Sequence, residues 1–126
     1  MRVIPVMHCR DMTQSLSFYT RILDFEHVGT WPPKGSPSFS VIKKEDIEIN
    51  LSSHRGDGVP GNVVIIEVQN IDNLFKTFLQ RGLDTSLKKD SPVHQAPLDQ
   101  TWGRREFYVT DPSGNTLRFS EKLYPK

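Results

Sequence analysis

The sequence has 126 residues, a formal net charge of +1 at pH 7 and 36% hydrophobic residues, a composition typical of one globular domain. Neither sign of charge forms a long run, so we expect no nucleic-acid partner. The single cysteine, Cys9, excludes an internal disulfide and favours a reducing compartment. No segment has the length and apolar character of a signal peptide or a membrane span, so we expect a cytoplasmic protein with no membrane partner.

The first half of the chain predicts a strand, a helix and then three further strands. Asp11 is the expected cap of the helix, because an aspartate directly before an apolar run can accept hydrogen bonds from the free N–H groups of the first turn. Apolar side chains then recur at helical spacing from Met12 to Leu23. The predicted segments are a strand over 2–9, a helix over 10–23, a strand over 25–31 and a hairpin with strands over 39–44 and 47–52.

The second half predicts the same elements in the same order. Asn70 is the expected cap of its helix and Gly82 the expected stop, since glycine readily adopts the left-handed conformation that ends many helices. A "PSGN" turn separates the last two alternating segments and predicts a hairpin. The predicted segments are a strand over 62–68, a helix over 69–82, a short strand over 85–89, a loop over 90–103 and a hairpin over 105–122.

An internal repeat relates the two halves. Sliding the sequence along itself by 59 positions places Met12 on Ile71 and Tyr19 on Phe78, and both the strands and the helices overlay. The chain therefore predicts an α+β fold with two tandem copies of a strand–helix–strand–strand–strand module. Within a single domain over 1–126, we place module 1 at about 1–53, a linker at 54–61 and module 2 at about 62–126.

Two motifs at opposite ends of the chain resemble those of a known superfamily. The segments "RDMTQSLSFYTRILDF" and "WGRREFYVTDPSGNTLRF" are similar to the opening and closing motifs of the glyoxalase/bleomycin resistance protein/dioxygenase superfamily, also called the vicinal oxygen chelate fold. The resemblance covers essentially the whole chain. It implies curled mixed sheets with a concave pocket, helices on the outer faces, and a homodimer that encloses the pocket. Because one fold hosts many chemistries, it indicates the fold more strongly than an activity.

The resemblance also locates the metal ligands of the metal-dependent members. A transition metal needs about three or more nitrogen, oxygen or sulfur ligands, and a permanently charged arginine repels it. The matching positions here are occupied by Ile4, Glu48, Val63 and Arg118. Only Glu48 can bind a metal, so we expect neither a metal nor another cofactor. A displaced site made of His8, Glu48 and Glu67, which share a predicted sheet face, stays open as the alternative.

Arg118 interrupts an otherwise alternating strand, and its partner is left open by the sequence. Overlaying "DIEIN" on "TLRFS" makes Glu48 its counterpart in the first module. One of three carboxylates, Glu48, Glu67 or Glu106, is expected to pair with it. In the other alternative, Arg118 is free to bind a carboxylate or phenolate of a ligand through a charge-assisted hydrogen bond.

No residue is predicted to be catalytic. Cys9 and His8 are adjacent in a strand and point to opposite faces, so they form no nucleophilic dyad, and Cys9 is expected in the core. Binding features are better represented, since aromatic rings offer a large contact area with few rotamers to fix. The predicted ligand-binding residues are Trp31, Phe39, Glu48, Asn50, Glu67, Trp102, Tyr108 and Arg118.

The leading functional hypothesis is a small-molecule binding protein of the bleomycin-resistance type, which sequesters a drug or metabolite in a dimeric pocket without a metal. The competing hypothesis is an enzyme of the same superfamily, such as a lyase, an isomerase or a dioxygenase. A structural or regulatory dimer with an occluded pocket is the third. The expected partners are a small-molecule ligand and a second copy of the chain.

Overall fold

The structure is a computed structural model that describes residues 1–124 and divides them into two compact units. Unit 1 contains Met1–Asn62 and Thr110–Asn115, and unit 2 contains Val63–Val109 and the residues from Thr116 onward. Each unit holds one four-stranded mixed sheet and a helix that covers one of its faces. The predicted α+β fold with two strand–helix–strand–strand–strand modules is confirmed.

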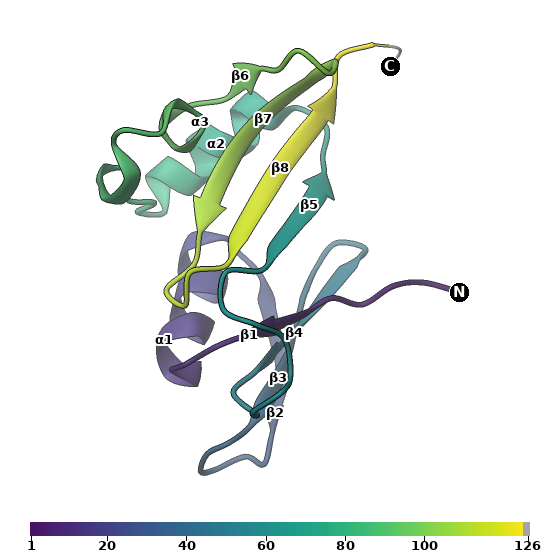
Figure 1. Cartoon of the computed structure of the whole chain (residues 1–126), viewed down its shortest axis with the longest axis vertical. Helices are drawn as coiled ribbons and strands as arrows, with labels where there is room; N and C mark the ends of the chain where they lie inside the picture. Colours follow the sequence, from purple (N-terminus) through teal and green to yellow (C-terminus); the bar gives the residue numbers. More distant parts are fainter. Residues whose placement is uncertain (125–126) are drawn as a thin grey trace. The chain divides into compact units, whose positions relative to one another are not determined.

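The predicted strands and helix of the first half are all present in unit 1. They are β1 (Val6–His8), α1 (Met12–Ser17), η1 (Phe18–Ile22), β2 (Glu26–Trp31), β3 (Phe39–Lys44) and β4 (Ile47–Ser52). The sheet has the order β1-β4-β3-β2, with β1 parallel to β4 and the other neighbours antiparallel (Figure 1). Strand β1 is shorter than predicted. It follows Pro5, which has no N–H to donate to a ladder.

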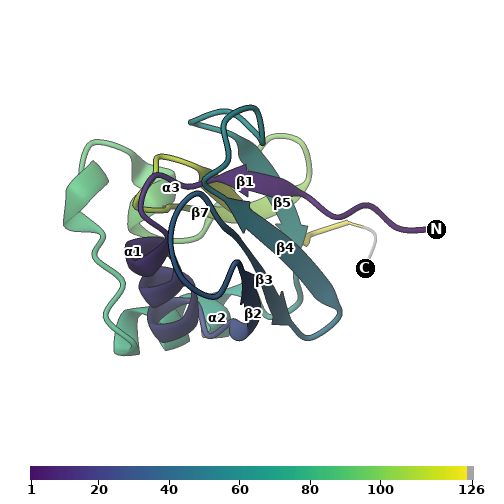
Figure 2. The same cartoon turned by 90° about the horizontal axis from the view of Figure 1, so that it is seen from below.

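The helix of unit 1 begins where the sequence predicts, and α1 lies along one side of the sheet (Figure 2). Asp11 occupies the N-cap position, and its Oδ1 accepts a hydrogen bond from the backbone N–H of Gln14 at 3.0 Å. After Ser17 the helix continues as the wider π-helical turn η1. Tyr19 in this turn is fully buried and donates its hydroxyl to Asp111 Oδ2 at 2.7 Å. Burial and the nearby carboxylate hold the pKa of Tyr19 well above its usual value.

The turn Thr110–Asn115 carries the "DPSGN" motif and packs within unit 1. Asp111 Oδ1 accepts hydrogen bonds from the backbone N–H groups of Ser113 and Asn115, both at 2.9 Å. Asn115 is fully buried, and its Nδ2 donates to the carbonyl of His8 at 2.7 Å and to Asp111 Oδ2 at 3.0 Å. The motif therefore forms a buried polar network whose side chains satisfy one another.

The core of unit 1 follows the period of two that strands impose. Met7, Ile49 and Leu51 are buried, and they alternate with partly exposed residues on the other sheet face. Cys9 is also fully buried, as predicted. Burial raises the pKa of its thiol to about 11, so the group stays protonated at neutral pH, whereas the thiolate is the reactive form.

Unit 2 contains a longer helix and a second mixed sheet. Its elements are β5 (Val63–Glu67), α2 (Ile71–Gln80), η2 (Ser86–Lys88), α3 (Pro92–Gln95), β6 (Leu98–Asp99), β7 (Arg104–Thr110) and β8 (Thr116–Lys122). The order is β5-β8-β7-β6, with β5 parallel to β8 (Figure 1). Phe75 and Phe78 of α2 pack on Phe107 and Phe119 of the sheet with ring centroids between 5.0 and 5.9 Å apart. This aromatic cluster forms the core of the unit together with buried aliphatic side chains such as Ile71, Val109 and Leu117.

Both ends of α2 agree with the prediction, but the capping side chain differs. Asn70 occupies the N-cap position with a left-handed backbone (φ 58°), and its side chain makes no capping hydrogen bond. The carboxylate of Glu121 in β8 accepts instead from the backbone N–H of Asn70 at 3.0 Å and of Ile71 at 3.1 Å. Gly82 ends the helix with a positive φ of 103°, and Leu83 N–H donates to the carbonyl of Phe78 at 2.9 Å.

The segment between α2 and β7 differs from the prediction. Residues 85–89 were predicted as a strand, but they contain the 3₁₀ turn η2, because Asp84 Oδ1 accepts from both the N–H and the hydroxyl of Ser86. The predicted loop over 90–103 contains α3 and the short strand β6. Among residues 1–124 no helix has the length and apolar character that a membrane span requires.

Candidate functional site

The sheet of unit 1 has a second face, opposite the helix, that carries exposed aromatic side chains. Trp31 is 47% exposed and pairs in register with Phe39, with ring centroids 5.5 Å apart and planes inclined by 31°. Gly29 allows the indole to lie against its own strand, because a Cβ at this position would be 2.6 Å from the Trp31 ring. We call this surface the unit 1 face; it contains Val6, Trp31, Phe39, Val41, Glu48 and Asn50.

Glu48 and Asn50 are the polar members of the unit 1 face. Glu48 accepts a hydrogen bond from Arg2 at 2.6 Å, and Lys43 Nζ lies 3.8 Å from the same oxygen, so its charge is compensated. Asn50 lies in the central strand β4. Its Oδ1 is buried and has no hydrogen-bond partner within the described residues.

The corresponding surface of unit 2 is organised around a buried carboxylate, that of Glu106, which is 1% exposed. Its Oε2 accepts from Ser120 Oγ at 2.7 Å and Trp102 Nε1 at 3.4 Å. Its Oε1 accepts from Arg118 Nη2 at 2.9 Å and the Tyr108 hydroxyl at 3.2 Å. We call this surface the unit 2 face; it contains Ile65, Glu67, Glu106, Tyr108, Arg118 and Ser120, with Trp102 at its edge.

Hydrogen bonding keeps Glu106 ionised despite its burial. Burial alone would raise the pKa of this carboxyl, but the hydrogen bonds from Ser120, Arg118 and Trp102, together with the arginine charge, outweigh it. The pKa of Glu106 therefore lies below its ordinary value. The same surroundings raise the pKa of Tyr108, chiefly through burial, so its hydroxyl remains a hydrogen-bond donor at neutral pH.

Arg118 is the cationic partner of this carboxylate. Its guanidinium carbon lies 5.0 Å from the centre of the Tyr108 ring and 5.9 Å from that of the Trp102 ring, within the range of cation–π attraction. Of the three carboxylates that the sequence offered as partners, the structure selects Glu106. Arg118 is therefore not a free cation. Its Nε is buried and, across residues 1–124, has no hydrogen-bond partner.

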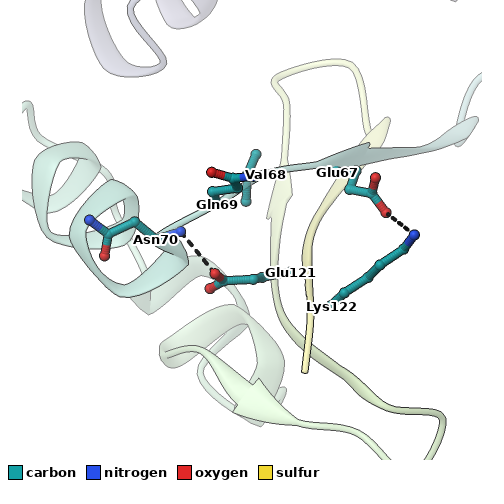
Figure 3. A pocket seen from close by; sticks show the side chains of 6 residues that line it. All are labelled: Glu67, Val68, Gln69, Asn70, Glu121 and Lys122. Atoms are coloured by element: carbon teal, nitrogen blue, oxygen red, sulfur yellow. Dashed lines mark hydrogen bonds and ion pairs between the residues drawn. The ribbon is translucent and has the colours of Figure 1, made fainter. Parts of the chain in front are cut away.

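Glu67 lies at the edge of the unit 2 face in a pocket of about 470 Å³ (Figure 3). Its carboxylate accepts from Arg104 Nη1 at 2.6 Å and lies 4.0 Å from Lys122 Nζ. These two contacts lower the pKa of Glu67, the hydrogen bond from Arg104 most strongly. Glu121, which also lines the pocket, binds the N-terminus of α2, so both carboxylates of the pocket are already engaged. The pocket is lined by Glu67, Val68, Gln69, Asn70, Glu121 and Lys122.

The eight predicted ligand-binding residues divide equally between the two units. Two side chains that were not predicted as site residues, Glu106 and Ser120, are central to the unit 2 face. The signal for them is their spacing, since each lies two residues from Tyr108 or Arg118 and therefore shares its face. Unit 1 holds Trp31, Phe39, Glu48 and Asn50, and unit 2 holds Glu67, Trp102, Tyr108 and Arg118.

The ladder register corrects one part of the predicted repeat. Val6 and Ile65 are related by the offset of 59 positions, and they pair with Asn50 and Arg118 respectively. Asn50, rather than Glu48, is therefore the counterpart of Arg118. The overlay of the two short sequence segments was wrong by two residues, because a shift of two keeps every side chain on the same face and leaves the alternation unchanged.

The residues proposed for a displaced metal site belong to different units: His8 and Glu48 to unit 1, and Glu67 to unit 2. In the part of the chain that the structure describes, no three His, Cys, Asp or Glu side chains lie close enough together to hold a metal ion. Glu48 is paired with Arg2, and Glu67 is paired with Arg104.

Comparison with known proteins agrees with this architecture. The family model of the Glyoxalase/Bleomycin resistance protein/Dioxygenase superfamily matches residues 5–119. A bleomycin resistance protein of Geobacillus stearothermophilus is 26% identical, over 95% of this chain and 96% of its own length. A bleomycin resistance protein of Staphylococcus aureus has the same identity and coverage.

Solved structures share the fold. The bleomycin resistance determinant encoded on the transposon Tn5 superposes with a TM-score of 0.76 at 18% identity, covering 97% of this chain and 98% of its own. The bleomycin-binding protein of bleomycin-producing Streptomyces verticillus, complexed with copper(II)-bleomycin, superposes with a TM-score of 0.63 at 25% identity, covering 94% and 93%. The family match spans nearly the whole sequence, and the chain belongs to the glyoxalase/bleomycin resistance protein/dioxygenase superfamily.

Proposed function

We propose that this chain is a binding protein of the bleomycin-resistance type, which sequesters a small drug-like or metabolic ligand without chemical turnover. The observation that carries the proposal is the presence, in both units, of exposed aromatic rings beside polar side chains. Trp31 is 47% exposed at the unit 1 face, and Trp102 is 56% exposed at the unit 2 face. Rings of this size bury a large apolar area on binding at a low cost in side-chain entropy, which suits an extended ligand with flat rings.

The relatives support the same class of function. Those of Geobacillus stearothermophilus and Staphylococcus aureus are bleomycin resistance proteins, and the likeness extends over nearly all of both chains. The Streptomyces verticillus protein is bound to copper(II)-bleomycin. A ligand with aromatic or heteroaromatic groups joined by polar linkages is therefore the class to test first.

A homodimer is part of the proposal. Val28, Val63 and Ile65 are apolar side chains that are about half exposed or more, and a second copy of the chain would remove such surface from water. The free, buried thiol of Cys9 is compatible with a reducing, cytoplasmic compartment.

Ligand binding is proposed to need no metal. Of the positions that the sequence matched to the family's metal ligands, Ile4 and Val63 carry no donor atom and Arg118 is cationic. Glu48 is paired with Arg2, and the ladder register puts the neutral Asn50 in its place as the counterpart of Arg118. We expect elemental analysis of the purified protein to find nickel, zinc, manganese and iron well below one ion per chain. Stoichiometric metal, together with metal-dependent stabilisation that is lost in Glu48→Ala, would contradict this part of the proposal.

A thermal-shift panel tests the binding function. Bleomycin and a set of aromatic drugs and metabolites are compared on the wild type, on Trp31→Ala and on Tyr124→Ala, a control that removes an exposed ring beyond β8. At least one ligand is expected to raise the melting temperature of the wild type and of the control but not of Trp31→Ala. A response that is equal in all three proteins would remove the unit 1 face from the proposal. Recovery of a chemically altered ligand would favour the competing enzyme.

A further inference from the structure

Unit 2 contains a pocket that the proposed function does not use. It lies where β5 and β8 end and α2 begins, and all six residues that line it belong to this one unit (Figure 3). Its volume of about 470 Å³ falls within the range of roughly 300–1,000 Å³ that is common for small-molecule sites. Among the described residues no aromatic ring lines it, and Val68 is the only apolar residue of its wall. The pocket therefore differs in chemical character from the aromatic faces.

One end of the pocket carries a negative charge that the backbone holds in place. The carboxylate of Glu121 accepts from the backbone N–H of Asn70 at 3.0 Å and of Ile71 at 3.1 Å. These N–H groups begin α2, so the carboxylate occupies the position that an anion takes at a helix N-terminus. An anionic ligand would have to displace Glu121 or lie beside its fixed charge. This end of the pocket therefore disfavours anions.

The opposite end offers one hydrogen-bond acceptor and one donor. Glu67 receives both of its contacts on Oε2, from Arg104 at 2.6 Å and from Lys122 at 4.0 Å, so across residues 1–124 its Oε1 accepts no hydrogen bond. The separation of 4.0 Å is longer than a hydrogen bond, and Lys122 Nζ donates to no other group in this part of the chain. A ligand can therefore donate to Glu67 and accept from Lys122 without breaking the contact with Arg104.

Gln69 lies between these two ends (Figure 3). Its side chain is exposed, and a carboxamide both donates and accepts hydrogen bonds. The pocket thus combines an acceptor-only carboxylate, a donor-only ammonium group and an amide that has both capacities. A hydroxyl group also donates and accepts, so it can bind each of these three groups.

The charges around the pocket cancel. The carboxylates of Glu67 and Glu121 are balanced by Lys122 and by Arg104, which pairs with Glu67. A charged ligand would lose part of its hydration here without meeting a net charge of the opposite sign, and the loss of hydration is costly for an ion. The pocket therefore favours a neutral ligand over an anion or a cation.

We infer that this pocket is a separate binding site, which takes a neutral polyhydroxylated ligand such as a monosaccharide or a cyclic polyol. Neighbouring hydroxyls of the ring donate to Glu67 Oε1 and accept from Lys122 Nζ, and its C–H groups lie against Val68. The site goes beyond the proposed function, because an aromatic ligand has no ring to stack on in this pocket.

Three sugars of one shape and different charge test the site. D-Glucose is neutral, D-glucuronate is an anion and D-glucosamine is a cation, whereas cyclohexanol is a similar ring with a single hydroxyl. In ¹⁵N-resolved NMR titrations, we expect glucose to shift the amide signals of residues 68–71 with a dissociation constant of about 1 mM. Glucuronate and glucosamine should bind about threefold more weakly because they are charged, and cyclohexanol should cause no shift.

Two substitutions at exposed positions should change the charge preference in opposite directions. Lys122→Met removes a cation and keeps the apolar stem, so this variant should bind glucosamine more tightly than glucose. Glu67→Gln removes an anion, so it should bind glucuronate more tightly than glucose. Lys76→Met is the matched control, because it removes an exposed lysine of α2 that does not line the pocket, and it should keep the wild-type order of the three sugars.

Several outcomes would overturn the inference. One is a wild-type protein that binds glucosamine or glucuronate more tightly than glucose, which would indicate an ion site. Another is an order of the three sugars that stays unchanged in both Lys122→Met and Glu67→Gln. The absence of shifts at residues 68–71 with every sugar would also overturn it. The thermal-shift panel with Trp31→Ala tests the proposed function separately, so either proposal can fail without the other.

Discussion

At the scale of single residues, the unit 2 face depends on one carboxylate and its four donors. Glu106 is buried, yet it remains charged because Ser120, Arg118, Trp102 and Tyr108 all donate to it. A buried ion pair contributes less to stability than its short distance suggests, because both groups lose hydration. Removing one partner, however, lowers the free energy of unfolding by more than the intact pair contributes to it, because the remaining buried charge has no counter-charge.

Glu106→Ala should therefore destabilise the protein strongly. The substitution leaves the guanidinium of Arg118 and three neutral donors without their acceptor, and we expect a loss of about 2–4 kcal/mol in the free energy of unfolding. Urea denaturation, followed by far-ultraviolet circular dichroism, measures this loss. Glu67→Ala is the matched control, because its carboxylate is exposed and its ion pairs are screened by water. A loss as small as that of the control would show that the buried network does not stabilise unit 2.

The same carboxylate predicts how stability depends on pH. The pKa of Glu106 lies below its ordinary value of 4.5 in the folded protein, so its contribution is complete above about pH 4.5 and is lost as the pH falls through the folded pKa. Glu106→Gln does not titrate. The difference in unfolding free energy between the wild type and this variant should therefore shrink as the pH falls below about 4.5. A difference that stays constant from pH 7 to pH 3 would contradict this account.

The sequence located Arg118 on the correct face but did not identify its partner. Alternation alone assigns a side to each residue, and it is unaffected when a strand slides by two residues. The register that pairs Ile65 with Arg118, and the approach of β7 that brings Glu106 to it, depend on tertiary packing. The contact between Arg118 and Glu106 neutralises the charge of the unit 2 face, and composition alone could not predict this contact.

At the scale of elements, the start of α2 is stabilised by a distant side chain. The sequence placed Asn70 at the cap, and Asn70 does occupy it, but a left-handed backbone turns its side chain away from the capping role. The carboxylate of Glu121 accepts from the first two N–H groups and also complements the positive end of the helix dipole. Strand β8 therefore fixes the N-terminus of α2 (Figure 3).

Removing this cap should cost an amount typical of helix caps. Glu121→Ala is expected to lower the free energy of unfolding by about 0.5–2 kcal/mol. Glu121→Gln, which keeps an acceptor oxygen and removes the charge, should cost less. Amide hydrogen exchange locates the effect, with faster exchange in the first turn of α2 and no change in α1. Asn70→Gly removes the side chain and keeps the left-handed backbone accessible, so the capping assignment would be wrong if this variant were more harmful than Glu121→Ala.

The elements that the sequence predicted best are those with strong periodicity and clear caps. Both predicted helices and the β3–β4 hairpin fall within the predicted ranges, and the β7–β8 hairpin begins one residue before its predicted range. An amphipathic helix face or an alternating strand next to a polar turn marks these elements locally. The strand predicted over residues 85–89 is absent. Asp84 accepts two hydrogen bonds from Ser86, and these bonds stabilise a turn instead of a strand. The short elements α3 and β6 have too few residues for any period to be visible.

At the scale of the whole molecule, the duplicated module explains why two equivalent faces exist. Each copy uses one sheet face for its core and leaves the other partly exposed, and the two faces have diverged into an asparagine-centred and an arginine-centred version. The module boundaries placed at 53 and 62 remain a prediction. The family membership, which was inferred from motifs at both ends of the chain, is confirmed.

The proposed homodimer gives a further test. Light scattering should return twice the 14.4 kDa mass of one chain. Ile65→Lys introduces a charge on the unit 2 face at a site that is 56% exposed, and it should shift the protein toward the monomer. Leu87→Lys in η2, an exposed position outside the strands of the sheet, is the control and should remain dimeric. A wild-type protein that is monomeric at micromolar concentration would remove the dimer from the proposal.

Native mass spectrometry after incubation with bleomycin and the other panel ligands tests the central claim, that this chain sequesters a small molecule without changing it. The expected spectrum contains two chains carrying a ligand whose mass is unaltered, and Trp31→Ala gives the same two chains with much less ligand. A ligand released with an altered mass, or the absence of an adduct with every compound of the panel, would contradict that claim.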